Sequence, residues 1–412
     1  MQVFFFEKHL LFFIMKKYIL LFPALLIILL NHCTNDLEEI PITEIASPSN
    51  EVSQSNNNSS NSSSSSQNTT TDESFDHKKM LTNWADNIII PSITSFKNSL
   101  TKLQEVANIF VGDPTSDNLL SLKEIWFSSY LKWQYVEMFD IGIAEEIYFK
   151  NRMNLYPVNI QRTENNISNK SYDLNKSSNF TSQGFSALDY LLFGIEENTD
   201  KIVTKYLDSS LNYGTYLNDV IFQMIELTNL VQTQWEGSYR EKFIESIDNT
   251  ATSSINLIIN DFIFYYEKGY RAYKFGIPAG IWSGDPLPDR IEAYYGENYS
   301  KLLALEAGIA VDQFFNGKSY DDPTIIGLSL KHYLDYVESD VDDKLSNRIN
   351  DQLNTATDKI SSLNTNFKTQ IQEDNNQMLA TYDAIQKTVV MLKVDMLQKL
   401  NISIDYVDAD GD

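Results

Sequence analysis

The sequence has 412 residues, which is enough for two or three domains with a sizeable hydrophobic core. Its formal net charge is -24 at pH 7, and this excess of negative charge argues against nucleic acid as a partner. Tyr and Phe are abundant, at 23 residues each, which favours well-filled helical cores or an aromatic-lined cleft.

Residues 1–32 have the pattern of a secretion signal. Two lysines follow Met15, the expected true start, and residues 18–30 are an apolar run too short to span a membrane comfortably. Cys33, the single cysteine of the chain, comes directly after this run and resembles the lipid-modified cysteine of a bacterial lipobox. We therefore predict a protein anchored in the cell envelope, at the outer membrane, through a lipid on Cys33. Ordinary signal cleavage with an incidental thiol is the alternative.

Residues 33–75 are predicted to be a flexible tether. The run SNNNSSNSSSSSQNTTT has no apolar periodicity and cannot bury enough surface to order itself. Such a segment would let a folded body stand off from a membrane anchor.

From residue 76 onward the apolar pattern is helical nearly throughout, and it predicts an all-α fold of two packed antiparallel helical bundles, 76–240 and 241–412. Apolar residues three or four apart from Leu345 to Ile371 predict a helix of seven turns. A second helix is expected to begin after Ser253, a good N-cap residue.

Few residues have the spacing that hydrolytic chemistry needs. The four histidines are His9, His32, His77 and His332, and no two lie three or four apart, as paired zinc ligands on a helix would. There is no glycine-rich phosphate loop either.

Lys268, Arg271 and Lys274 form a basic stripe in an acidic protein. The stripe could hold an anionic group or balance a buried carboxylate such as Glu137. The alternative is that these cations are simply favoured at a helix C-terminus.

In the stretch GFSALDYLLFG, Ser186 and Asp189 are three apart and share one face of a short helix. This stretch resembles the signature of the imelysin family, G-x-H-x-x-E, with Gly184 matching, Ser186 at the histidine position and Asp189 at the glutamate position. Other segments resemble the family in the same order along the chain, so that the resemblance covers 76–412: LTNWADNIIIPSITSF (81–96), WFSSYLKWQYVEMFDIG (126–142), FGIPAG (275–280) and LKVDMLQKLNISIDYVDADGD (392–412).

The resemblance implies two helical bundles with a site at their interface, where the motif helix meets Glu137 of the Trp-rich helix. The family takes its peptidase name from insulin cleavage, yet many members are associated with iron uptake in the cell envelope. Serine is a poor replacement for a metal-binding imidazole, and Asp is one methylene shorter than Glu. We therefore expect no catalytic residue.

The predicted ligand-binding residues are listed together here: Glu137, Gly184, Ser186, Asp189, Arg271 and Lys274. Glu137 and Asp189 are the candidate ligands for iron or another divalent cation. The favoured function is a non-catalytic binding protein that works with envelope iron-uptake proteins. A divergent metallopeptidase and a structural lipoprotein that docks a membrane partner are the alternatives.

Glu137 is expected to be buried, because it lies on nearly the same helix face as Trp126 and Trp133. A buried carboxylate needs a cation or a donor. The partner is either a Lys or Arg from another helix, or a site shared with Ser186 and Asp189.

Overall fold

A computed structural model of the protein describes residues 74–406, which belong to one compact unit, Asp72–Asp412. Helices form the regular structure of this part of the chain, with no β-sheet and only an isolated bridge between Lys318 and Ile326. The predicted all-α class is confirmed. The predicted signal peptide, Cys33 and the tether as far as residue 73 lie outside the described residues.

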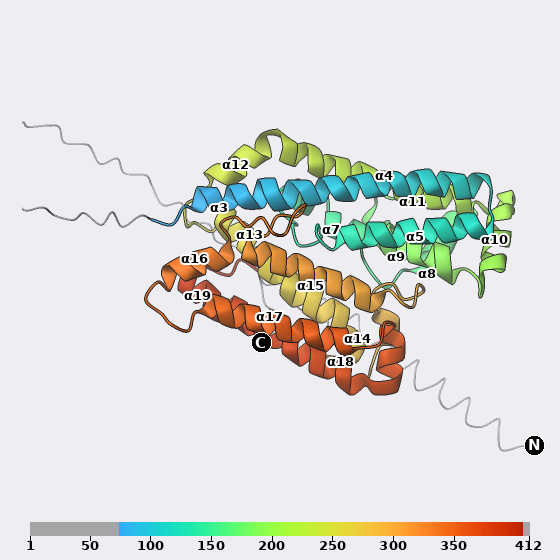
Figure 1. Cartoon of the computed structure of the whole chain (residues 1–412). Coiled ribbons are helices and arrows are strands. Elements are labelled where there is room, and N and C mark those ends of the chain that lie inside the picture. Colours follow the sequence, from blue (N-terminus) through green and yellow to red (C-terminus); the bar gives the residue numbers. More distant parts are fainter. Residues whose placement is uncertain (1–73, 407–412) are drawn as a thin grey trace, which may run out of the picture. The chain divides into compact units, whose positions relative to one another are not determined.

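A long helical rod begins the folded part (Figure 1). It consists of α3 (His77–Trp84), the π-helical turn η1 (Ala85–Ile89) and α4 (Ile90–Gly112). α4 packs against α5 (Ser116–Trp133) and α11 (Tyr213–Gln234). The loop from α4 to α5 is short, so the two helices are antiparallel. One stripe of α4 provides core residues at helical spacing, all at most 1% exposed: Ile93, Phe96, Leu100, Leu103, Ala107 and Phe110.

Short helices fill the space around this rod. They are α6 (Ile143–Glu146), α7 (Phe149–Met153), α8 (Ile160–Asn169), η2 (Ser177–Ser182), α9 (Gly184–Asp189), η3 (Tyr190–Gly194), α10 (Thr199–Leu207), η4 (Ser209–Leu211), η5 (Trp235–Tyr239) and α12 (Arg240–Glu245).

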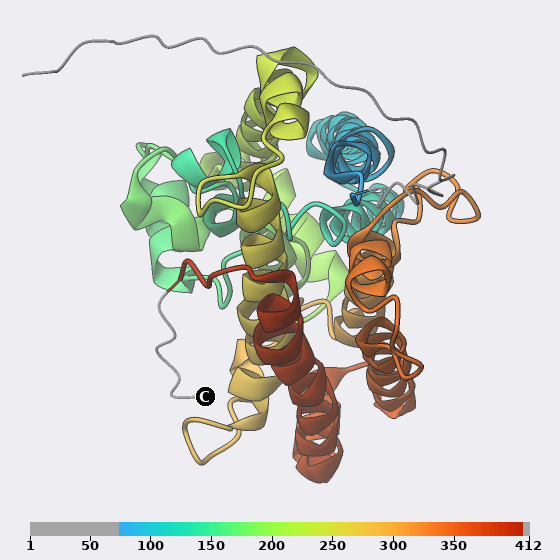
Figure 2. The same ribbon diagram turned by 90° about the vertical axis from the view of Figure 1, so that its left-hand side faces the viewer.

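A second rod opens the C-terminal half. α13 (Ser254–Phe264) begins where predicted, with the Ser253 side chain accepting a hydrogen bond from the backbone N–H of Asn256. It continues as the π-helix η6 (Tyr265–Gly276) and as α14 (Ile277–Ala279). Figure 2 shows this rod beside the last helices of the chain, and η6 packs along α18. The remaining elements are η7 (Pro288–Arg290), α15 (Ser300–Asn316), α16 (Leu330–Val337), α17 (Leu345–Ser362), α18 (Phe367–Val390), η8 (Met391–Met396) and α19 (Leu397–Leu400).

The helix predicted over 345–371 is two helices, α17 and α18, and the prediction of a single one was wrong. The chain leaves the helix at Leu363, and the side chain of Asn366 caps α18 by accepting from the backbone N–H of Lys368 and Thr369. Leu363 and Phe367 are both buried, so the apolar pattern runs on across the break. The apolar pattern therefore predicted which residues of this stretch are buried, but it did not predict where the helix ends.

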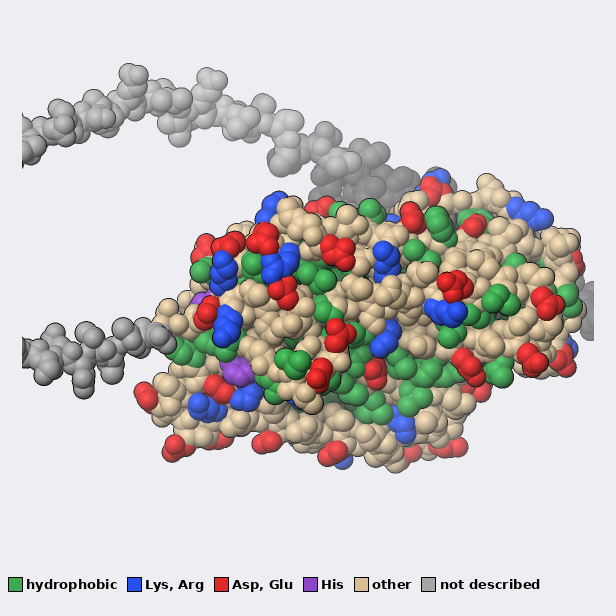
Figure 3. Space-filling view, turned by 45° about the horizontal axis from the view of Figure 1, so that its top comes forward, with side chains coloured by type: hydrophobic (Ala, Val, Ile, Leu, Met, Phe, Trp, Pro, Cys, Tyr) green, Lys and Arg blue, Asp and Glu red, His purple; other side chains and the backbone are tan. Residues whose placement is uncertain are grey.

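The predicted division between 76–240 and 241–412 stays a prediction. α12 and α13, on either side of it, both pack against α3. None of the described helices is long and apolar enough to cross a bilayer. In the space-filling view of Figure 3, acidic and basic side chains are interspersed over the visible face.

Candidate functional site

The motif helix α9 begins at a glycine that the structure requires. Gly184 has φ +71°, in the left-handed region, and a Cβ at this position would lie 2.2 Å from the backbone oxygen of Met153. Every residue of α9 is buried, and the π-helix η3 follows it directly. The glycine thus lets α9 pack directly against the end of α7.

Ser186, at the histidine position of the motif, uses its hydroxyl locally. Its Oγ donates a hydrogen bond of 2.7 Å to the backbone oxygen of Leu155, and the residue is 6% exposed. A serine hydroxyl is a weak metal ligand compared with imidazole. Here it ties α9 to the chain segment after α7.

Asp189, at the glutamate position, holds a loop from the other half of the chain. Its two carboxylate oxygens accept hydrogen bonds from the backbone N–H groups of Tyr295 (2.9 Å) and Gly296 (2.8 Å). Burial raises the pKa of Asp189 to about 7, although these two donors act in the opposite direction. Asp189 is therefore an acceptor that fixes the loop after η7 against the motif helix.

Ser186 and Asp189 stand in the wall of a cavity of about 280 Å³. Residues 156–189 and 289–295 contribute to its lining. The lining is aromatic and apolar with a few polar groups: Tyr156, Pro157, Val158, Ile160, Ser186, Asp189, Asp289, Ile291, Ala293, Tyr294 and Tyr295. We call it the motif cavity.

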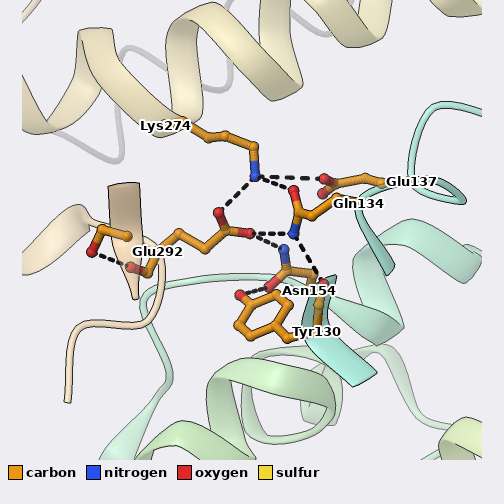
Figure 4. Close-up of polar contacts among 7 residues, drawn as sticks. Tyr130, Gln134, Glu137, Asn154, Lys274 and Glu292 are labelled. Carbon is orange, nitrogen blue, oxygen red and sulfur yellow. Dashed lines mark hydrogen bonds and ion pairs between the residues drawn. The ribbon is translucent and has the colours of Figure 1, made fainter. Parts of the chain in front are cut away.

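Glu137 lies in the turn after α5 and is buried, as predicted, at 7% exposure. Trp126 and Trp133 on the same face are fully buried. The cation near Glu137 is Lys274 of η6, whose Nζ lies 3.8 Å from Glu137 Oε2 (Figure 4). Burial raises the pKa of Glu137, and Lys274 opposes this shift.

Lys274 makes its closest ion pair with Glu292, at 2.6 Å, and both side chains are 2% exposed. Lys274 Nζ also donates to Gln134 Oε1 at 2.8 Å. Glu292 Oε1 accepts from the amides of Asn154 (2.8 Å) and Gln134 (3.3 Å). Figure 4 shows these groups converging from the turn after α5, the end of α7, η6 and the loop after η7. We call Gln134, Glu137, Asn154, Lys274 and Glu292 the buried polar network.

Arg271 lies apart from the motif cavity. It is fully buried, its Nε donates to the backbone oxygen of Glu267, and its guanidinium lies over the rings of Trp282 and Tyr382. Lys268 pairs with Glu267 at 2.8 Å. The basic stripe thus balances buried carboxylates along η6.

The side chains do not fit a metal ion held jointly by Glu137 and Asp189. Glu137 has a lysine as its cation, both oxygens of Asp189 accept backbone N–H groups, and the two residues line different cavities. Within residues 74–406, no three His, Cys, Asp or Glu side chains are placed to hold a metal ion.

The sequence predictions missed three members of the buried polar network, Glu292, Asn154 and Gln134. Glu292 and Asn154 lie in irregular segments, where no helical spacing marks a residue as buried. Gln134 follows Trp133 directly, and that neighbour was the available signal.

Comparisons with known proteins show the fold and the family of the chain. Two crystal structures are similar in fold: a Parabacteroides distasonis protein described as an iron-regulated protein A precursor (TM-score 0.65, 16% identity, covering 79% of this chain and 95% of that one) and an imelysin-like protein of Psychrobacter arcticum (TM-score 0.62, 16% identity, covering 80% and 97%). Iron-regulated protein A of Synechococcus elongatus is 24% identical over 119 residues, which span 29% of this chain and 32% of that protein. The sequence profile named Imelysin matches residues 89–393. The chain belongs to the imelysin family.

Proposed function

We propose that this protein is an exported, lipid-anchored binding protein of the cell envelope that serves iron acquisition and does not hydrolyse peptides. The observation that carries the proposal is that both motif side chains form hydrogen bonds with the backbone. Ser186 donates to a backbone carbonyl and Asp189 accepts from two backbone N–H groups. Hydrolysis needs an activated water or nucleophile, and neither side chain is arranged to supply one.

Three further observations support the proposal. Relatives in fold and sequence carry the name iron-regulated protein A, one of them as a precursor, and a precursor is typical of an exported protein. The motif cavity has the mixed aromatic and polar lining of a binding site. The net charge of -24 disfavours nucleic acid as a partner, and the family resemblance implies envelope proteins of iron uptake instead.

The role in iron acquisition predicts that the protein responds to iron supply. We expect its abundance in cells that carry the native gene to rise when iron is depleted with a chelator and to return when iron is restored. Deletion of the gene should slow growth in depleted medium and leave growth in replete medium unchanged. Quantitative immunoblots and growth curves measure this. Equal abundance in both media together with equal growth would refute the role.

The lipid anchor predicts where the protein is found. Cys33→Ala should move the protein from the membrane pellet to the soluble envelope fraction, because an acidic body is repelled by anionic lipids and needs the acyl chains for binding. Fractionation followed by immunoblotting measures the shift, with Ser53→Ala in the predicted tether as the matched control. A Cys33→Ala protein that stays in the pellet would contradict lipidation.

A further inference from the structure

A second cavity has Glu137 among its lining residues. It has a volume of about 270 Å³ and is enclosed by the end of α7, the segment after it and η6. It shares no lining residue with the motif cavity. Its lining includes two carboxylates, Glu137 and Asp140, two lysines, Lys150 and Lys268, and the hydroxyl-bearing Tyr265. We call it the Glu137 cavity.

Two buried oxygen atoms in residues that line this cavity make no hydrogen bond to the described part of the chain. They are Glu137 Oε2 and the hydroxyl of Tyr265, in residues that are 7% and 1% exposed. The nearest cation to Glu137 Oε2 is Lys274 Nζ at 3.8 Å, which is beyond hydrogen-bond distance. Buried polar atoms nearly always have partners, and these two belong to residues that line one cavity, so they are the candidate contacts for a polar group bound there.

Two lysines also line this cavity. Lys150 of α7 pairs at 3.0 Å with Asp140, which lines the cavity too, and Lys268 of η6 pairs with Glu267 at 2.8 Å. The exposed side chain of Tyr273 adds an apolar wall near solvent. Glu137 can accept a hydrogen bond, and Lys150 and Lys268 carry positive charge. Together they suit a ligand that has both a hydrogen-bond donor and an anionic group.

We propose that the Glu137 cavity binds a small zwitterion with an amino and a carboxylate group, of the size of an amino acid. The amino group donates to Glu137 Oε2 and to the Tyr265 hydroxyl, and the carboxylate lies toward Lys150 and Lys268. The volume of about 270 Å³ lies just below the range of about 300–1,000 Å³ that drug-sized ligands occupy, which suits a smaller ligand. This site is separate from the motif cavity and does not depend on the role in iron acquisition.

Calorimetric titration of the purified protein with each of the twenty amino acids tests the ligand class. We expect at least one to bind with a Kd below about 10 mM. Its two half-ligands, the carboxylic acid without the amine and the amine without the carboxylate, should bind at least about tenfold more weakly. If no amino acid binds, or if a half-ligand binds equally well, the proposal is wrong.

Variants locate the binding. Tyr265→Phe removes a hydroxyl without a partner, so the melting temperature should stay the same or rise while the affinity falls by about twofold to tenfold. Glu137→Gln should reduce the preference for the amino acid over its amine-free analogue. Asp289→Asn, in the motif cavity, is the matched control and should bind as wild type does. Wild-type affinity in Tyr265→Phe, with an unchanged fold by circular dichroism, would overturn the proposal even where Glu137→Gln does not fold.

Discussion

Lys274→Met is expected to lower the free energy of unfolding at neutral pH by about 3–5 kcal/mol. The ammonium of Lys274 is the cation shared by Glu292 at 2.6 Å and Glu137 at 3.8 Å, and it is 2% exposed. Methionine preserves most of the side-chain volume but leaves two buried carboxylates near each other with no positive charge between them. The desolvation of each carboxylate is then uncompensated. The loss should shrink in acid, because protonation of the carboxylates removes their charge.

Denaturant titrations at several pH values measure this effect. Lys102→Met is the matched control, because Lys102 pairs with Glu105 at 3.0 Å on the surface, where both side chains are more than half exposed. We expect the control to stay within about 1 kcal/mol of wild type. The double variant Lys274→Met with Glu292→Gln should recover part of the loss, since it removes one stranded charge. Equal stabilities for Lys274→Met and Lys102→Met would show that the buried polar network is not held by its lysine.

The second large effect is a pH dependence that originates at Asp189. Burial raises the pKa of this carboxyl from 3.8 to about 7 in the folded protein. The folded chain therefore holds the proton more tightly than the unfolded chain does. The stability that this provides is complete below about pH 4 and is lost as the pH rises through about 7. We expect the free energy of unfolding of wild type, relative to Asp189→Asn, to fall by about 4 kcal/mol between pH 4 and pH 8.

Asn resembles the protonated carboxyl in shape and charge, so the variant isolates the titration from the packing. Unfolding curves of both proteins at each pH give the difference in their free energies of unfolding. Taking this difference cancels the contributions of the other carboxyls, which titrate in both proteins. Asp289→Asn, at an exposed position of the same cavity, is the control for the substitution itself. A difference between wild type and Asp189→Asn that is constant with pH would mean that Asp189 keeps its ordinary pKa.

The fold was largely predictable because helical periodicity is a local property of the sequence. The stripe on α4 and the cap at Ser253 follow from residues close together in the chain. The break between α17 and α18 did not show in the apolar pattern, because Leu363 and Phe367 stay buried while the backbone changes direction. The Asn366 cap marks this break, and a cap is a weaker signal than a continuous apolar stripe.

The site was less predictable, because its polar contacts join segments far apart in the chain. The sequence indicated that Glu137 would be buried and left open whether a lysine or Asp189 would face it. In the structure the facing cation is Lys274, and Asp189 faces backbone N–H groups. Glu292, the stronger partner of Lys274, comes from an irregular loop that no spacing rule connects to α5.

Our proposal that the motif side chains of this imelysin-family chain do not hydrolyse peptides is tested by a peptidase assay. Purified protein is incubated with a peptide library, with and without a metal chelator, next to Asp189→Ala and to a variant with Ser186→His and Asp189→Glu, which restores the family motif. We expect wild type and Asp189→Ala both to stay at the level of the protein-free blank, with or without chelator. Cleavage by wild type that the chelator stops and that Asp189→Ala abolishes would contradict it.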